Sequence, residues 1–247
     1  MPKEMHNSIK ITLIIVATIA VLSIAGMIFY QSNFSSTNTI SVNGQGVEKA
    51  VPDLVSVYFS VDTKNSTSKQ AEDANSLIVS RLRSYIVSLG FSEEDLKTVN
   101  YNIYPDYDYT TGKTSGYRAS HSLSISFSVS EKDKITGVID AGTTAGAGIS
   151  YINFELSPQL EQQYKATAIQ TASEDARVKA EAIAEGFNKN LGRLVSVSLD
   201  SFNYYPTRVY DAAESGASSE EAKTTVAGIT PSETEVSAYV TAVYRLS

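Results

Sequence analysis

The chain contains no cysteine and no tryptophan, and only two of its 247 residues are histidine. Without cysteine there is no disulfide framework and no lipid attached through a thiol, so an exported form must be held together by its core. His6 precedes the first apolar segment, and His121 stands on an expected strand among serines. A zinc site or a Ser-His-Asp site would have to use His121, and no G-x-S-x-G nucleophile elbow is present. We therefore predict no metal, no cofactor and no catalytic residue, and we expect His121 to be an ordinary surface residue.

Positive charge is also scarce, with 20 Lys and Arg against 27 Asp and Glu. Beyond residue 30 the balance is 18 basic to 26 acidic residues, a net charge of −8. An acidic surface repels phosphate backbones, and no basic stripe is visible. We therefore expect no nucleic-acid partner.

Long apolar runs are absent except for one, Ile11 to Tyr30, which contains no charged residue. As a helix, such a run extends about 30 Å, the thickness of the hydrocarbon core of a bilayer. Lys3 and Lys10 precede it and the next basic residue is Lys49, which predicts a cytoplasmic amino terminus and an extracytoplasmic remainder. The alternative is a cleaved signal peptide, because Ser23 and Ala25 are small residues spaced as a cleavage site requires. The run continues past Ala25, so we expect an uncleaved, single-pass anchor in the lipid bilayer of the cell membrane.

The chain is thus divided into a cytoplasmic tail (1–10), a transmembrane anchor (11–30), a polar tether (31–39) and one domain (40–247). Two glycosylation sequons occur, at Asn33 and Asn65.

Hydrophobic periodicity predicts an α+β domain. Alternation with period two predicts strands at 40–47, 54–61, 98–109, 117–130, 149–156, 194–202 and 235–246. Spacings of three and four predict helices at 67–89, 130–145 and 158–190, with a short turn at Ser92 to Asp95. Hairpins and half-polar strands favour an antiparallel sheet layered with helices on one face, and Tyr204 to Pro231 is expected to be a mobile loop.

Each long helix has an expected inner face. For the first, this face consists of Ala71, Ala74, Ile78, Leu82, Tyr85 and Leu89. For the last, it consists of Leu160, Tyr164, Ala168, Ala172, Ala176, Ala180, Ile183 and Phe187. The alanines predict that a neighbouring element approaches the last helix closely.

Tyrosine is concentrated around Pro105, in the expected hairpin. Five tyrosines fall within seventeen residues: Tyr101, Tyr104, Tyr107, Tyr109 and Tyr117. They can stabilise a twisted hairpin by cross-strand pairing, or they can form a contact surface for another protein. We take Tyr104, Tyr107, Tyr109 and Tyr117 as interface candidates. Asp106 and Asp108 could hold a cation weakly, although EF-hand spacing is absent.

Six segments, spread over most of residues 40–246, resemble the SIMPL-domain family of exported proteins, which includes bacterial periplasmic immunogenic proteins. They are ISVNGQG (40–46), VPDLVSV (51–57), LKTVNYNIYPDYDY (96–109), GYRASHSLSISF (116–127), AGISYINFELS (147–157) and ASEDARVKAEAIAEGF (172–187). The resemblance implies an envelope location, an α+β fold, ring-like oligomers and, for some relatives, a link to oxidative-stress defence. It carries over no catalytic residue. The retained anchor departs from the periplasmic relatives, which are usually cleaved.

Three hypotheses follow for the function. The first is a non-enzymatic, membrane-anchored envelope protein whose domain self-associates into a homo-oligomer, with a link to stress defence. The second is a module that binds an envelope partner protein or a small ligand through the tyrosine hairpin. The third, which we rank last, is a hydrolase built around His121 and nearby carboxylates; it requires a deep pocket beside that residue.

Overall fold

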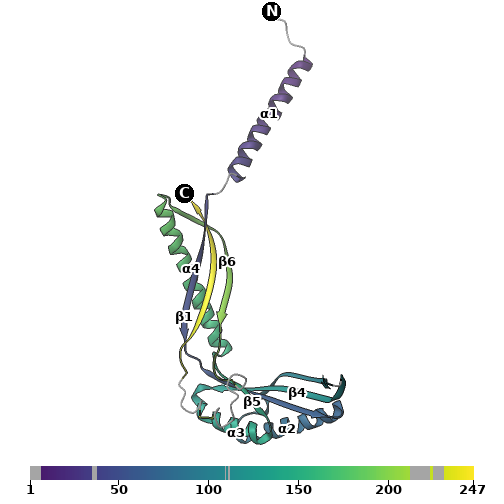
Figure 1. Cartoon of the computed structure of the whole chain (residues 1–247). Helices are drawn as coiled ribbons and strands as arrows, with labels where there is room; N and C mark the ends of the chain where they lie inside the picture. The colour runs from purple at the N-terminus through teal and green to yellow at the C-terminus, as the bar shows by residue number, and fades with distance from the viewer. Residues whose placement is uncertain (1–6, 35–37, 109, 111, 212–222, 225–230) are drawn as a thin grey trace, which may run out of the picture. The chain divides into compact units, whose positions relative to one another are not determined.

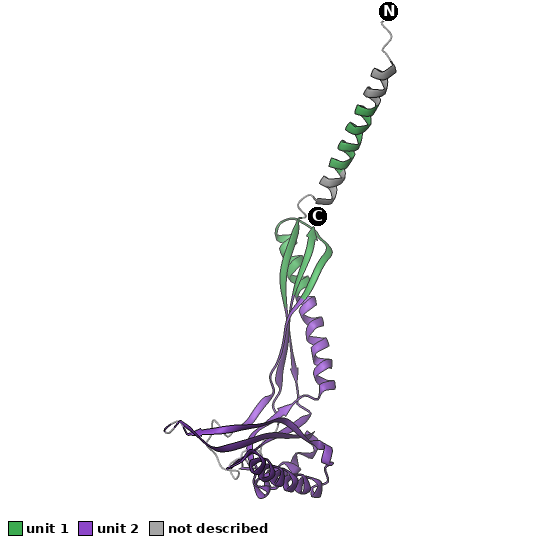
Figure 2. Cartoon of the chain, turned by 90° about the vertical axis from the view of Figure 1, so that its right-hand side faces the viewer, with its two compact units in different colours: residues 1–44, 176–198, 241–247 green, residues 45–175, 199–240 purple. Residues whose placement is uncertain are grey.

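The computed structural model describes residues 7–34, 38–108, 110, 112–211, 223–224 and 231–247, with side chains of the first helix described over 15–28 (Figure 1). The chain divides into two compact units (Figure 2). Unit 1 comprises residues 1–44, 176–198 and 241–247, and unit 2 comprises residues 45–175 and 199–240.

The first helix, α1, spans Asn7–Phe34. Its large apolar side chains between Ile15 and Ile28 are exposed. Within the described residues, no helix meets the length and apolarity required of a membrane crossing. The anchor at Ile11 to Tyr30 therefore stays a prediction.

Unit 2 is built around a five-stranded sheet with the order β3-β4-β2-β5-β7. The strands are β2 (Leu54–Asn65), β3 (Leu96–Asp108), β4 (Lys113–Ser128), β5 (Gly148–Glu155) and β7 (Thr207–Asp211). All four pairings are antiparallel. The register places Val57 beside both Ile125 and Ile152, so the apolar residues of three strands share one face.

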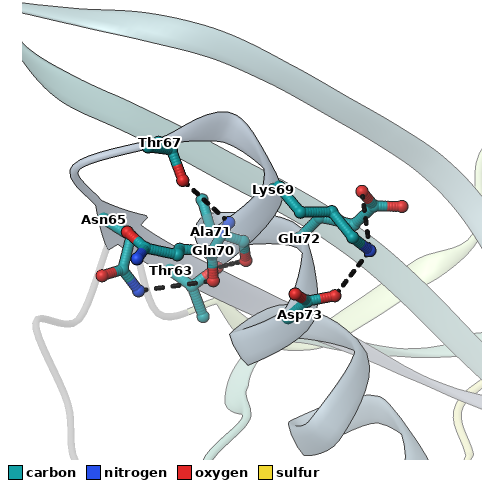
Figure 3. A network of polar contacts seen from close by, with 8 residues as sticks. All are labelled: Thr63, Asn65, Thr67, Lys69, Gln70, Ala71, Glu72 and Asp73. Atoms are coloured by element: carbon teal, nitrogen blue, oxygen red, sulfur yellow. Dashed lines mark hydrogen bonds and ion pairs between the residues drawn. The ribbon is translucent and has the colours of Figure 1, made fainter.

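Two helices, α2 (Ser68–Ser88) and α3 (Ile135–Ala145), cover this apolar face. The α2 helix begins where the Thr67 hydroxyl accepts a hydrogen bond from the Gln70 backbone N–H (Figure 3). Gly90, just past its end, has a φ of 87°, a conformation that favours glycine. Short 3₁₀ helices, η1 (Glu93–Asp95) and η2 (Val129–Lys134), lead into β3 and α3.

The second sheet has the order β1-β8-β6 and consists of β1 (Thr39–Ala50), β8 (Thr234–Leu246) and β6 (Leu191–Tyr204). These strands and the long helix α4 (Pro158–Gly186) contribute residues to both units. Within unit 2, a Cβ added to Gly46 would clash with the Ala168 carbonyl and lie 2.6 Å from the Ala172 nitrogen. The predicted close approach to the alanine face of α4 is thus confirmed, and its partner is β1.

The α+β class, the antiparallel pairing and nearly all predicted elements are confirmed. The strands nevertheless form two sheets, and β7 lies in the segment that we expected to be a loop. Of the rest of that predicted loop, residues 212–222 and 225–230 lie outside the described residues.

The predicted inner faces of the helices need correction at one end. On α4 the row of buried alanines continues from Ala180 to Ala184, whereas Ile183 and Phe187 are 40% and 73% exposed. On α2 the buried residues include Asn75 and Ile86, whereas Tyr85 is exposed. On α4 the buried stripe keeps a step of four residues, which carries it away from Ile183 and Phe187. On α2 the buried residues are spaced by four, seven and four: Ala71, Asn75, Leu82 and Ile86.

Candidate functional site: a hollow at His121

His121 lies on the same face of β4 as Leu123 and Ile125, because residues two apart along a strand point to the same side. Leu123 and Ile125 belong to the buried core. That face is covered by α2, so the ring is half-buried. The expectation of an ordinary surface residue is therefore wrong. The period-two pattern of the strand already places His121 on the core side, at the point where the core ends.

Asn75 of α2 fixes the orientation of the His121 ring. Its side chain is 1% exposed, and its Nδ2 donates to the carbonyls of Val61, at 2.8 Å, and Ala119, at 3.3 Å. Its Oδ1 is thereby aimed at His121 Nδ1, 3.2 Å away. Since an amide oxygen only accepts, Nδ1 of His121 carries the ring proton.

The other ring nitrogen completes a chain of hydrogen bonds. His121 Nε2 lies 2.9 Å from the hydroxyl oxygen of Thr98 on β3. Because the ring proton resides on Nδ1, Nε2 accepts and the Thr98 hydroxyl donates. Burial, followed by the nearby positive charge of Arg83, lowers the pKa of His121, so the neutral ring is the favoured form.

His121 and Thr98 border a hollow with a volume of about 390 Å³. It is lined by Glu72, Ser76, Val79, Ser80, Thr98, Tyr101 and His121. Small-molecule pockets usually have volumes of about 300–1,000 Å³. The hollow is thus large enough for a small ligand, and three elements of unit 2 contribute to it.

The order of Thr98, His121 and Asn75 is that of a nucleophile, a base and an orienting group. Acyl transfer additionally requires hydrogen-bond donors for the oxyanion that develops in the transition state. The carboxylate among the lining residues, Glu72, carries negative charge and opposes such an anion. The hollow beside His121 is open to solvent rather than the deep pocket that the hydrolase hypothesis requires, and its electrostatics do not favour that chemistry.

The tyrosine candidates do not gather on one face. The ring centroids of Tyr101 and His121 lie 4.9 Å apart, on the face of the sheet that α2 covers. Tyr104 pairs with Arg118 and lies on the opposite face. Tyr104 and Tyr107 are 44% and 55% exposed. Tyr117 is half-buried, and Tyr109 lies outside the described residues. What these tyrosines share is the hairpin at the free end of the strand order, where β3 is an edge strand.

Asp106 is engaged by the hairpin itself. It forms ion pairs with Lys64 and with Arg118, the latter at 3.6 Å. The hydrogen bond from Lys64 lowers the pKa of this carboxyl. Asp108 accepts a hydrogen bond from the Thr110 N–H at 2.8 Å. Across the described residues, no three His, Cys, Asp or Glu side chains gather as metal ligands.

Sequence reasoning missed Asn75 and Thr98. The position of Asn75 offered a signal, because it lies four residues after Ala71 on the buried stripe of α2. Thr98 offered none, since its role depends on the β3–β4 register.

Residues 40–244 match the SIMPL family, which is described as a protein of unknown function (DUF541). The chain belongs to the SIMPL family. The resemblance seen in the sequence is thereby confirmed. Among its relatives, the "Uncharacterized protein YggE" of Escherichia coli K12 is 28% identical over 198 residues, covering 78% of each chain. The protein of the same name from Edwardsiella ictaluri is 29% identical over 194 residues, covering 75% of this chain and 79% of the relative. The "26 kDa periplasmic immunogenic protein" of Brucella melitensis is 27% identical over 183 residues, covering 69% and 70%.

Proposed function

We propose that this SIMPL protein is a non-enzymatic, extracytoplasmic envelope protein, anchored through Ile11 to Tyr30, whose domain self-associates along the edge of β3. The name of the Brucella relative, which describes that protein as periplasmic, supports an extracytoplasmic location. The distribution of Lys3 and Lys10 before the apolar run supports the same orientation.

The proposal of self-association is supported by the edge strand β3 of the five-stranded sheet, which exposes apolar side chains. The edge strand β3 has 13 residues, and Val99, Tyr104 and Tyr107 are 55%, 44% and 55% exposed. Soluble proteins usually protect long apolar edges, because the backbone groups of an edge strand readily pair with another strand. The opposite edge strand, β7, has only five residues. The β3 edge therefore offers the longer backbone for strand addition, and it is interrupted by Pro105 and by the register shifts at Thr98/Asn100 and Asp106/Tyr107.

The charges of β3 favour a second copy of this chain as the occupant. Lys97 lies near one end of β3, and Asp108 lies at the other. When two copies of the strand pair in antiparallel fashion, the basic end of each meets the acidic end of the other. Such an interface is self-complementary, as a twofold dimer requires.

Sedimentation of the full chain in detergent tests this proposal. We expect a defined oligomer that shifts toward smaller species in Tyr104→Ala and Tyr107→Ala, and also in Tyr109→Ala. Truncating a well-packed aromatic contact costs about 2 kcal/mol, roughly thirtyfold in affinity. Tyr205→Ala is the matched control, because Tyr205 is 76% exposed but lies outside the hairpin. If the hairpin variants keep the parent mass and melt earlier, the tyrosines only stabilise the hairpin.

The anchor and the absence of catalysis have separate tests. Intact-mass measurement of membrane-extracted protein is expected to find residues 11–30 attached, and a mature amino terminus at Gly26 would contradict the anchor. His121→Ala is expected to leave intact any cellular phenotype that depends on this protein. If the variant folds and accumulates normally but the phenotype is lost, the hydrolase hypothesis is favoured.

Stress defence is a separate part of the proposal and comes from the family resemblance. A deletion strain is expected to survive peroxide less well than its parent, and equal survival would remove this part.

A further inference from the structure

Two of the hydroxyl groups that line the hollow at His121, those of Thr98 and Ser80, use their hydrogens within the protein. The Thr98 hydroxyl donates a hydrogen bond to His121 Nε2, and the Ser80 hydroxyl donates a hydrogen bond to the Ser76 carbonyl, 2.8 Å away. Both hydroxyl oxygens therefore present lone pairs to the hollow. The two ring nitrogens of His121 are already engaged by Thr98 and Asn75. A ligand that brings donors can therefore be bound by these two oxygens and by the Glu72 carboxylate.

The charge of the hollow points in the same direction. Glu72 contributes the carboxylate of the lining, and His121 is favoured in its neutral form; Arg83, whose positive charge lowers the pKa of His121, is not among the lining residues. Glu72 and Tyr101 both line the hollow; burial and, secondly, the carboxylate of Glu72 raise the pKa of Tyr101, whereas the ammonium group of Lys69 lowers it. The face of a tyrosine ring attracts a cation. A cation is therefore favoured by the carboxylate and by the ring together.

An ammonium group of the chain itself already approaches Glu72. Lys69 Nζ lies 3.6 Å from the Glu72 carboxylate, but it is held more closely by Asp73, at 2.7 Å (Figure 3). The carboxylate of Glu72 is thus within reach of an ammonium group without being tightly bound by it. A second ammonium group could compete with Lys69 for this position.

We propose that the hollow binds a primary ammonium group on a short alkyl chain. The ammonium supplies up to three donors to acceptors that include the Glu72 carboxylate and Thr98 Oγ1. The Tyr101 ring adds attraction for the charge, and Val79 offers an apolar surface for the alkyl chain. This inference does not depend on self-association through β3.

Isothermal titration calorimetry of the full chain in detergent, with butylammonium chloride as the titrant, tests the proposal. We expect saturable binding that butan-1-ol does not reproduce at the same salt concentration. Glu72→Gln is expected to weaken binding about tenfold or more, since a charge-assisted hydrogen bond is lost. Glu131→Gln is the matched control: it removes the same charge from η2, outside the hollow, and is expected to bind as the parent does.

Two further variants separate the ring and the competing lysine. Tyr101→Phe keeps the ring and is expected to retain binding, whereas Tyr101→Leu is expected to lose about threefold. Lys69→Gln is expected to bind more tightly, because the competing ammonium group is removed.

The proposal is overturned if Glu72→Gln binds as the parent does, if Glu131→Gln loses as much, or if butan-1-ol binds equally well. Parallel titration with Nα-acetyl-lysine amide identifies the source of the ammonium group. Tighter binding of that compound assigns the hollow to a lysine side chain of a partner, and tighter binding of butylammonium assigns it to a free amine.

Discussion

Asn75 Oδ1 and His121 Nδ1 lie 3.2 Å apart and connect α2 with β4 at the margin of the core of unit 2. The same amide donates to backbone carbonyls of β2 and β4, so one side chain attaches the helix to two strands. Because it also sets the ring tautomer, the hollow at His121 depends on this buried residue. Asn75 therefore contributes both to the stability of unit 2 and to the hydrogen-bonding pattern of the hollow.

Replacement of Asn75 is expected to destabilise the fold. Asn75→Ala removes the buried hydrogen bonds to the Val61 and Ala119 carbonyls, and leaves the Nδ1–H of the half-buried His121 without its acceptor. An unsatisfied buried polar group costs about 1–3 kcal/mol, and we expect a loss of that size in urea denaturation. Asn75→Asp should be worse, because a carboxylate oxygen would face two carbonyl oxygens. Asn102→Ala, on exposed β3, is the control and is expected to change stability little; similar losses at both positions would contradict the assigned role.

His121 is expected to titrate below the ordinary histidine value. Burial and the charge of Arg83 lower its pKa in the folded state, so on acidification the unfolded chain takes up the proton first. Stability should therefore fall as the pH drops below about 6.5, and the contribution of His121 should be complete above that pH. His121→Gln is expected to flatten this dependence. NMR titration of the ring resonances measures the pKa directly, and a value at or above that of an exposed histidine would contradict the burial argument.

Gly46→Ala is expected to disrupt the contact between β1 and α4. The added Cβ would meet the backbone of Ala168 and Ala172, which cannot move aside as the end of a flexible side chain can. Overpacking of this kind costs about 1–3 kcal/mol or more. Gly186→Ala is the matched control, because no atom lies within 4 Å of its added Cβ and alanine favours a helix. Thermal melting should show a loss only at Gly46, and equal melting of both variants would refute the close approach.

The fold was predictable where local patterns and the tertiary structure agree. Alternating residues in β2 and β4 place their apolar side chains on one face, and Ser157 followed by Pro158 marks the start of α4. The short β7 was missed because its five residues form a strand only by pairing with β5. The candidate site was missed for a similar reason: Asn75, Thr98 and His121 come from three elements, and only the sheet register and the position of α2 bring them together. The period-two pattern of β4 places His121 on the core side, but nothing in the local sequence identifies Asn75 and Thr98 as its partners.

Tyr58 is expected to ionise at a much higher pH than an exposed tyrosine. Its ring stacks on Tyr151 with centroids 4.2 Å apart, and its hydroxyl donates to the Glu155 carboxylate at 3.4 Å. Burial and, secondly, the negative charge of Glu155 raise the pKa of Tyr58 to about 12. Since the folded state favours the neutral form, the corresponding stability is present below about pH 10 and is lost as the pH rises toward 12.

Absorbance titration of the tyrosines, compared between the parent and Tyr58→Phe, measures this ionisation as a difference. The difference is expected near pH 12. Glu155→Gln should lower the pKa of Tyr58 but leave it above about 10, because burial is the larger cause and remains. Glu131→Gln, which removes a carboxylate from η2, should leave the titration unchanged. If the signal missing from Tyr58→Phe lies near pH 10, the ring is solvated, and Tyr151 and Glu155 do not shield it from water.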